Sequence, residues 1–198
     1  MIILDPDLDL PSTAIASRGK AARPPKGFAE HGDSFKQKLP SARSLERFLN
    51  EASAAIRLHG QVSVLLTNDT TMRRLNRRFR GKNKTTDVLS FPSGEEVKAE
   101  IAGDLAVSVP TARRQAAERG HSLSAEIKLL MLHGLLHLLG FDHETDEGQM
   151  FRRERTLRAK LGLPQGLIER AGGAAGRPLK SKSPQRRSAQ RATRSSRL

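Results

Sequence analysis

Three histidines lie close together in the most apolar stretch of the chain, residues 129–143. His133 and His137 are four residues apart, so on a helix their rings share one face about one turn apart. Gly140 can end that helix, because glycine adopts the left-handed conformation of a C-terminal cap without strain. The chain can then turn back and bring His143 to the other two rings. Three converging imidazoles with no fourth protein ligand are typical of a catalytic zinc site.

The competing interpretation is that these histidines are ordinary core residues with satisfied hydrogen bonds. Two buried rings four residues apart would each need a polar partner inside an apolar helix. Gly134 lies between them, although a mid-helix glycine costs about 1 kcal/mol relative to alanine. That cost indicates that something approaches the helix backbone closely at this point. We therefore favour a metal site.

The order of these residues also bears on the chemistry. A His-x-x-x-His-x-x-Gly-x-x-His pattern is the ligand skeleton of the metzincin proteases, which also need a glutamate directly after the first histidine as general base. Gly134 occupies that position here. The ligand pattern is present without the protease base, so we do not expect a peptidase.

Composition limits the class of protein further. The 198-residue chain has no cysteine, which excludes disulfide partners and thiolate ligands and suits a reducing cytoplasm. The first residues have neither the basic nor the apolar region of a signal peptide. The longest apolar run is too short to cross a bilayer. We expect a cytoplasmic protein without a membrane partner.

The formal net charge of +14 indicates a polyanionic partner, most often a nucleic acid. With no Trp or Tyr and seven Phe, phosphate contacts are expected more than base stacking. One basic cluster consists of Arg77, Arg78, Arg80, Lys82 and Lys84. Cations favour the last turn of a helix, which would explain the first two, but the charge continues into the following loop. Arginine there can grip a phosphate with two hydrogen bonds, so both interpretations stay open.

Hydrophobic periodicity predicts an α/β fold in which a small mixed β-sheet of about four strands packs with helices, around a central helix that carries the histidines. Strands are expected over residues 2–4, 62–67, 87–91 and 103–109, and helices over 41–60, 69–81, 110–120, 125–140 and 144–161. We divide the chain into a possible first edge strand within 1–10, a flexible loop 11–40, a catalytic domain 41–170 and a disordered basic tail 171–198.

Two groups of motifs together resemble the YbeY family of bacterial endoribonucleases and ribosomal RNA maturation factors. The matching segments are Leu75-Asn76, Phe79-Arg80-Gly81-Lys82, Thr86-Asp87-Val88-Leu89-Ser90-Phe91-Pro92, Gly103-Asp104 and His133-Gly134-x-x-His137-Leu138-x-Gly140-Phe141-Asp142-His143. The resemblance covers about residues 41–163, and the histidine motif beside the Thr-Asp-Val-Leu-Ser-Phe-Pro segment is highly specific. Asn83 departs from the family, which commonly has Asp there, and the loop and tail have no recognised counterpart.

The resemblance implies one zinc ion per chain, held by His133, His137 and His143. It also implies cleavage of single-stranded RNA, processing of the 3′ end of small-subunit ribosomal RNA, and late ribosome quality control. Arg80 is carried over as the important arginine, which would stabilise transition-state charge. From the charge pattern, Arg77, Lys82 and Lys84 are candidate RNA contacts. Oligomeric state, protein partners and cleavage site are not implied.

Several mechanistic alternatives stay open at this point. Zinc could deliver hydroxide to phosphorus or polarise a phosphoryl oxygen while the 2′-OH attacks. We interpret Asp142, Glu144 and Asp146 as the first turn of a helix rather than as a general base. Asp87 or Asp104 could orient a ligand histidine. The rival functions are a metallohydrolase of a non-RNA substrate and a ribosome- or RNA-associated protein in which the metal is structural.

Overall fold

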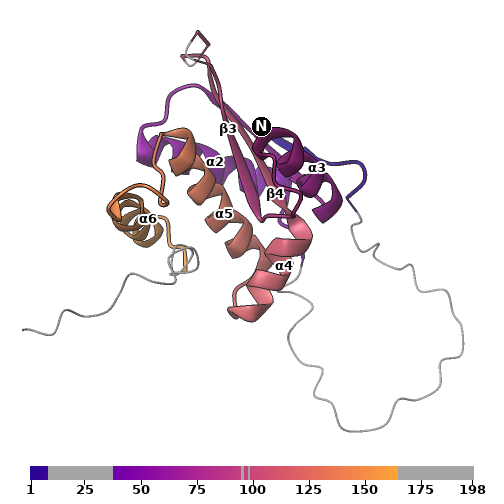
Figure 1. The fold of residues 1–198 in the computed structure, drawn as a ribbon. Helices are drawn as coiled ribbons and strands as arrows, with labels where there is room; N and C mark the ends of the chain where they lie inside the picture. The colour runs from indigo at the N-terminus through magenta and orange to yellow at the C-terminus, as the bar shows by residue number, and fades with distance from the viewer. Residues whose placement is uncertain (9–37, 95, 98, 165–198) are drawn as a thin grey trace, which may run out of the picture.

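The computed structural model describes residues 1–8, 38–94, 96–97 and 99–164 (Figure 1). The expected loop over 11–40 lies outside the described residues except for 38–40, and the expected basic tail 171–198 lies outside them entirely. Within the described part, no helix has both the length and the apolar character needed to cross a membrane.

A mixed four-stranded sheet forms the centre of the fold, as the sequence predicted. Its strands are β1 (Ile2–Leu4), β2 (Gln61–Thr67), β3 (Val88–Pro92) and β4 (Ile101–Ser108), in the order β1-β2-β4-β3. The first three strands in this order are parallel, and β3 runs antiparallel to β4. Among the described residues, the outer side of β3 is therefore an edge of the sheet.

The described residues form five helices, four of which pack around the sheet while the last packs against the helix before it (Figure 1). They are α2 (Ala42–Ile56), α3 (Asp69–Arg80), α4 (Val109–Glu118), α5 (Leu123–Leu138) and α6 (Gln149–Lys160). The larger core joins α2 and α5 to one face of the sheet, and a smaller core packs α3 on the other. Helix α5 is the central helix, because 11 of its 16 residues are buried.

Gly134 lets α5 lie close against the sheet. A Cβ atom there would come within 2.8 Å of Leu105 Cδ2 and 3.2 Å of Ser90 Oγ. The hydroxyl of Ser90 donates a hydrogen bond to the Gly134 carbonyl oxygen (3.2 Å). The close approach expected at this glycine is therefore made by β3 and β4, and it sets the height of the histidine-bearing helix above the sheet.

Several boundaries differ from the prediction. Helix α5 begins at Leu123 because the Ser122 hydroxyl, rather than that of Ser124, accepts a hydrogen bond from the backbone N–H of Ala125 (3.1 Å). Strand β4 begins two residues earlier than expected, at Ile101. Strand β3 includes Pro92, which an edge strand tolerates because its outer side needs no donor.

The last helix shows the largest shift. It begins at Gln149 instead of residue 144, and Gly148 precedes it in the left-handed conformation (φ +78°). Residues 143–148 form turns and bends, so the segment after His143 is a loop.

Candidate metal centre

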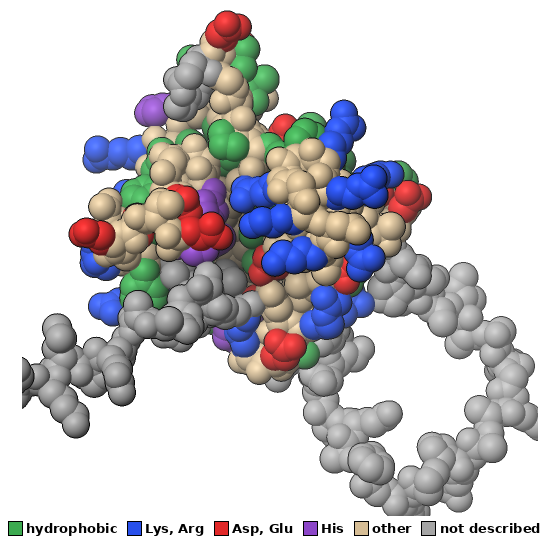
Figure 2. Space-filling view, in the orientation of Figure 1, with side chains coloured by type: hydrophobic (Ala, Val, Ile, Leu, Met, Phe, Trp, Pro, Cys, Tyr) green, Lys and Arg blue, Asp and Glu red, His purple; other side chains and the backbone are tan. Residues whose placement is uncertain are grey.

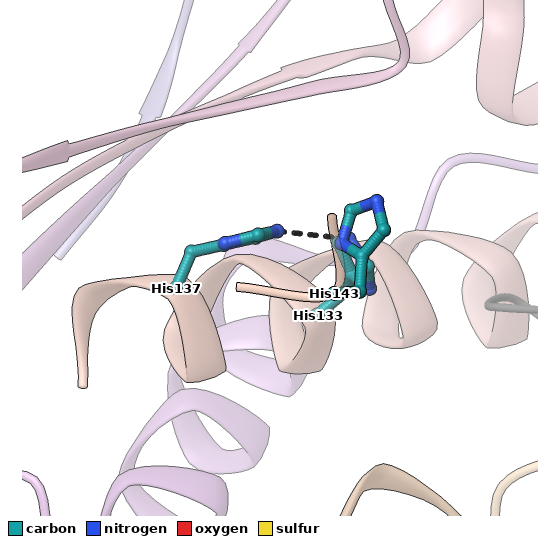
Figure 3. Close-up of side chains that lie close together, drawn as sticks. All are labelled: His133, His137 and His143. Carbon is teal, nitrogen blue, oxygen red and sulfur yellow. Dashed lines mark hydrogen bonds between the residues drawn. The ribbon is translucent and has the colours of Figure 1, made fainter. Parts of the chain in front are cut away.

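Helix α5 and the turn after it bring the three predicted histidines together. His133 and His137 project from one face of α5, and Nε2 of one lies 3.2 Å from Nε2 of the other (Figure 3). The helix ends at a turn in which Gly140 has φ +95° and the Phe141 N–H donates to the Leu136 carbonyl (3.1 Å). The ring of His143 then lies 5.2 Å, centre to centre, from each of the other two rings.

Acidic side chains shape the loop that carries His143. Asp142 accepts a hydrogen bond from the backbone N–H of Glu144 (3.0 Å), and this bond lowers the pKa of the Asp142 carboxyl. Asp146 accepts from the N–H of Met150 in the first turn of α6 (2.8 Å). The prediction that these acids lie in the first turn of a helix was wrong. Asp142 and Asp146 instead hold a loop, because a carboxylate accepts backbone N–H groups equally well there.

The environment of His137 favours a neutral ring. Burial, followed by the neighbouring rings of His133 and His143, lowers the pKa of His137 from 6.5 to about 4. A hydrogen bond with the backbone of Phe141 acts in the opposite direction but is outweighed. At neutral pH the ring therefore keeps a lone pair, which is the form that binds a metal.

The geometry of the three rings fits a metal ion. One ligand atom from each ring can be chosen so that all lie within 4.8 Å of one another. Two nitrogens bound to one tetrahedral zinc ion would lie roughly 3.3 Å apart, close to the 3.2 Å between His133 Nε2 and His137 Nε2. In addition, Nδ1 of His143 is buried without a hydrogen-bond partner among the described residues, and a metal ion would satisfy it.

One carboxylate beside these rings was not singled out from the sequence. Glu154 of α6 lies with Oε2 3.1 Å from Nδ1 of His133, and its other oxygen accepts a hydrogen bond from Arg158. The two acids considered for this contact have other surroundings: Asp87 lines the same cleft but accepts a hydrogen bond from Gln115 (2.9 Å), and Asp104 is exposed on β4. The one feature of the sequence that could have indicated Glu154 is an acidic residue at a position of the amphipathic helix that faces the core.

The histidines open into a cleft of about 520 Å³. Its histidine wall consists of His133, His137 and His143; its cation wall consists of Arg80, Lys82 and Lys84. Asp87, Asp142 and Glu144 also line it. Figure 2 shows this distribution, with histidines between basic side chains on one side and acidic ones on the other. Arg77 is not part of the lining, so the structure brings three of the four predicted cations to the site.

The backbone under the cation wall is fixed by a buried amide. Gly81 ends α3 with φ +67°, and its N–H donates to the Arg77 carbonyl oxygen (3.2 Å). Asn76, which is 2% exposed, donates from Nδ2 to the Lys84 carbonyl oxygen (2.7 Å). The loop therefore folds back over the end of α3 and carries its lysines along the cleft. Sequence reasoning did not identify this role of Asn76.

Residues 31–162 match the model of a family described as Endoribonuclease YbeY. The chain is 52% identical to a protein of that name from Solibacter usitatus, over 64% of this chain and 84% of the relative. It is 49% identical to one from Koribacter versatilis, over 75% of this chain and 97% of the relative.

A solution structure from Thermotoga maritima also aligns with this chain. It has 28% identity and a TM-score of 0.46, and the alignment covers 66% of this chain and 84% of that one. The family model spans the cation wall and all three histidines. The chain belongs to the Endoribonuclease YbeY family.

Proposed function

We propose that this chain is a metal-dependent endoribonuclease that cuts single-stranded RNA. Its proposed role is processing of the 3′ end of small-subunit ribosomal RNA and late ribosome quality control. The proposed location is therefore the cytoplasm. The observation that carries the proposal is a three-histidine group that opens into a cation-lined cleft in a member of an endoribonuclease family.

We propose zinc as the metal, one ion per chain, with His133, His137 and His143 as its ligands. Imidazole nitrogen suits zinc, whereas calcium and magnesium prefer oxygen ligands. A zinc ion at this position supplies Lewis-acid chemistry, which stabilises negative charge on a phosphoryl oxygen and makes water a stronger acid. The histidines hold the ion with neutral rings, consistent with the lowered pKa of His137.

The cation wall would bind the RNA backbone. Arg80 is the proposed catalytic arginine, because its guanidinium can form two hydrogen bonds to a phosphate and stabilise the extra charge of the transition state. Lys82 and Lys84 would bind neighbouring phosphates. Arg77, outside the cleft lining, would add only to the general positive field.

Two other functions are consistent with three histidines alone. A purely structural metal normally has four protein ligands, and three histidines form the group here. A hydrolase of a small or peptidic substrate would have no use for three cations along the same cleft. The count of three ligands therefore argues against a purely structural metal, and the charge beside the metal centre favours RNA over a small or peptidic substrate.

The direct test compares wild type with His137→Ala on two RNAs of the same sequence. One RNA is single-stranded, and the other is paired with its complement. We expect wild type with zinc to cut the single strand in preference to the duplex, and His137→Ala to cut neither above background. Equal cleavage by the two proteins would contradict the role of the histidines. Preference for the duplex would contradict the assigned substrate.

A further inference from the structure

Two charged side chains of α6 lie buried beneath the histidine wall. Glu154 is 1% exposed and Arg158 is 3% exposed. They are one helical turn apart, and the Arg158 guanidinium donates a hydrogen bond to Oε1 of Glu154. Removing two charges from water costs free energy. A buried ion pair is therefore often no more stabilising than a well-packed apolar pair of similar size. A contribution to packing therefore does not explain why this charged pair is buried.

The second oxygen of Glu154 points to the metal centre. Oε2 lies 3.1 Å from Nδ1 of His133. A carboxylate paired with a guanidinium accepts hydrogen bonds, so the His133 proton belongs on Nδ1. The lone pair is then on Nε2, the atom that lies 3.2 Å from Nε2 of His137. Glu154 thus selects the tautomer in which His133 presents its lone pair toward the other rings.

We propose that Glu154, held by Arg158, is a positioning residue that fixes the tautomer and orientation of His133 and so raises the metal affinity of the centre. This inference rests on the proposed metal site. The two ligands on α5 then differ in their hydrogen-bond partners: His133 bonds to a buried carboxylate, and His137 bonds to the backbone of Phe141. A carboxylate also makes the ring a stronger electron donor than a carbonyl does.

The chain offers a matched control on α5. Glu126 is also fully buried, accepts a hydrogen bond from Arg119, and lies with Oε2 3.4 Å from Nδ1 of His121. It has the same kinds of partners as Glu154, but His121 does not belong to the three-histidine group. Glu126→Gln therefore reproduces the loss of a buried carboxylate between an arginine and a histidine.

The experiment measures zinc affinity of the full-length wild type, Glu154→Gln and Glu126→Gln by competition with a chromogenic chelator. Glutamine keeps the size of the side chain but can present either an oxygen or an NH₂ group to Nδ1, so it does not select one tautomer. We expect Glu154→Gln to bind zinc about 10–100-fold more weakly and Glu126→Gln to bind within about twofold of wild type.

Thermal unfolding with and without zinc provides a second readout. Both variants should melt at lower temperature than wild type without metal, because each leaves an arginine without its buried carboxylate partner: Arg158 is buried and Arg119 is half-buried. At one limiting zinc concentration, only Glu154→Gln should show a smaller zinc-induced rise in Tm. Wild-type zinc affinity and an unchanged rise in Glu154→Gln would overturn the inference while leaving the proposed nuclease intact. A wild type that binds no zinc would overturn both.

If Glu154→Gln does not fold, the position of the ring proton of His133 in the wild type tests the role of Glu154 instead. In the zinc-loaded, ¹⁵N-labelled protein, we expect the His133 ring to carry its proton on Nδ1. A spectrum with that proton on Nε2 would contradict the role assigned to Glu154.

Discussion

The histidine wall of the cleft is held by buried contacts, whereas the cation wall projects its side chains into solvent. His133 contacts Glu154, which is fully buried, and His137 lies on the central helix. Arg80, Lys82 and Lys84 are all exposed, and their side chains form no hydrogen bond or ion pair with any other described residue. Only the backbone beneath them is fixed, through Asn76.

This difference suits two different ligands. A metal ion requires donor atoms at set distances and angles, so its ligands need rigid support. An RNA single strand is flexible, so long cationic side chains that keep their rotamer freedom can follow its phosphates. We therefore expect substitutions in the histidine wall to abolish function, and substitutions in the cation wall to reduce it by degrees.

The largest effect is expected from His133→Ala, which removes a ligand. RNA cleavage should fall to background, and zinc should no longer raise Tm, because metal bound only by the folded chain adds to the free energy of unfolding. At a zinc concentration 100 times the wild-type Kd, the lost stabilisation would be about 2.7 kcal/mol. Zinc-dependent unfolding curves measure it, and a variant that still gains stability from zinc would contradict the ligand assignment.

Arg80→Ala should act more selectively. Arg80 is exposed and outside the ligand set, so zinc content and Tm should stay at wild-type values. Loss of one transition-state hydrogen-bond donor lowers the rate by about 10²–10³, measured as kcat on a short single-stranded RNA.

Arg77→Ala is the matched control, since it removes the same charge one turn away in α3 but outside the cleft lining. Its loss of rate should be much smaller. Equal losses in the two variants would mean that overall charge, and not the position of Arg80, determines the rate.

The sequence predicted the histidine wall because its signals are local. Spacing on one helix and a glycine turn bring the three rings together within eleven residues of chain. Glu154 is 21 residues from His133, and no periodicity links the two positions. By charge pattern alone Arg77 and Arg80 look alike; the family resemblance singled out Arg80, and the structure places Arg80 but not Arg77 in the cleft lining. The boundary of α6 was misplaced because carboxylates bond backbone N–H groups in loops and helix ends alike.

Asn76→Ala should have a moderate effect on the cation wall. It leaves the Lys84 carbonyl oxygen without its donor, which costs about 1–3 kcal/mol where the group stays buried. The freed loop would hold its lysines less well, so KM for RNA should rise a few-fold while zinc affinity is unchanged. Denaturant unfolding and steady-state kinetics measure the two effects. A fall in zinc affinity would show that the two walls are coupled.

The smallest effect on turnover is expected from deleting residues 177–198, which lie outside the described structure. This segment has eight Lys or Arg and no acid. If it binds RNA by charge alone, deletion should reduce the slope of log affinity against log salt by at most about 6. Partial engagement makes a change of a few units the expected result, and turnover of a saturating short substrate should not change. Identical slopes for the full-length and shortened proteins would show that this segment does not bind RNA through its charge.

The central claim is that a metal ion on the three histidines is required for RNA cleavage. Its most direct test is a zinc titration of the metal-free full-length chain, with bound zinc and the rate of single-strand cleavage measured in the same samples. The account predicts that the rate rises in proportion to bound zinc and stops rising at one ion per chain. Full cleavage by the metal-free chain, or one bound zinc without any cleavage, would contradict it.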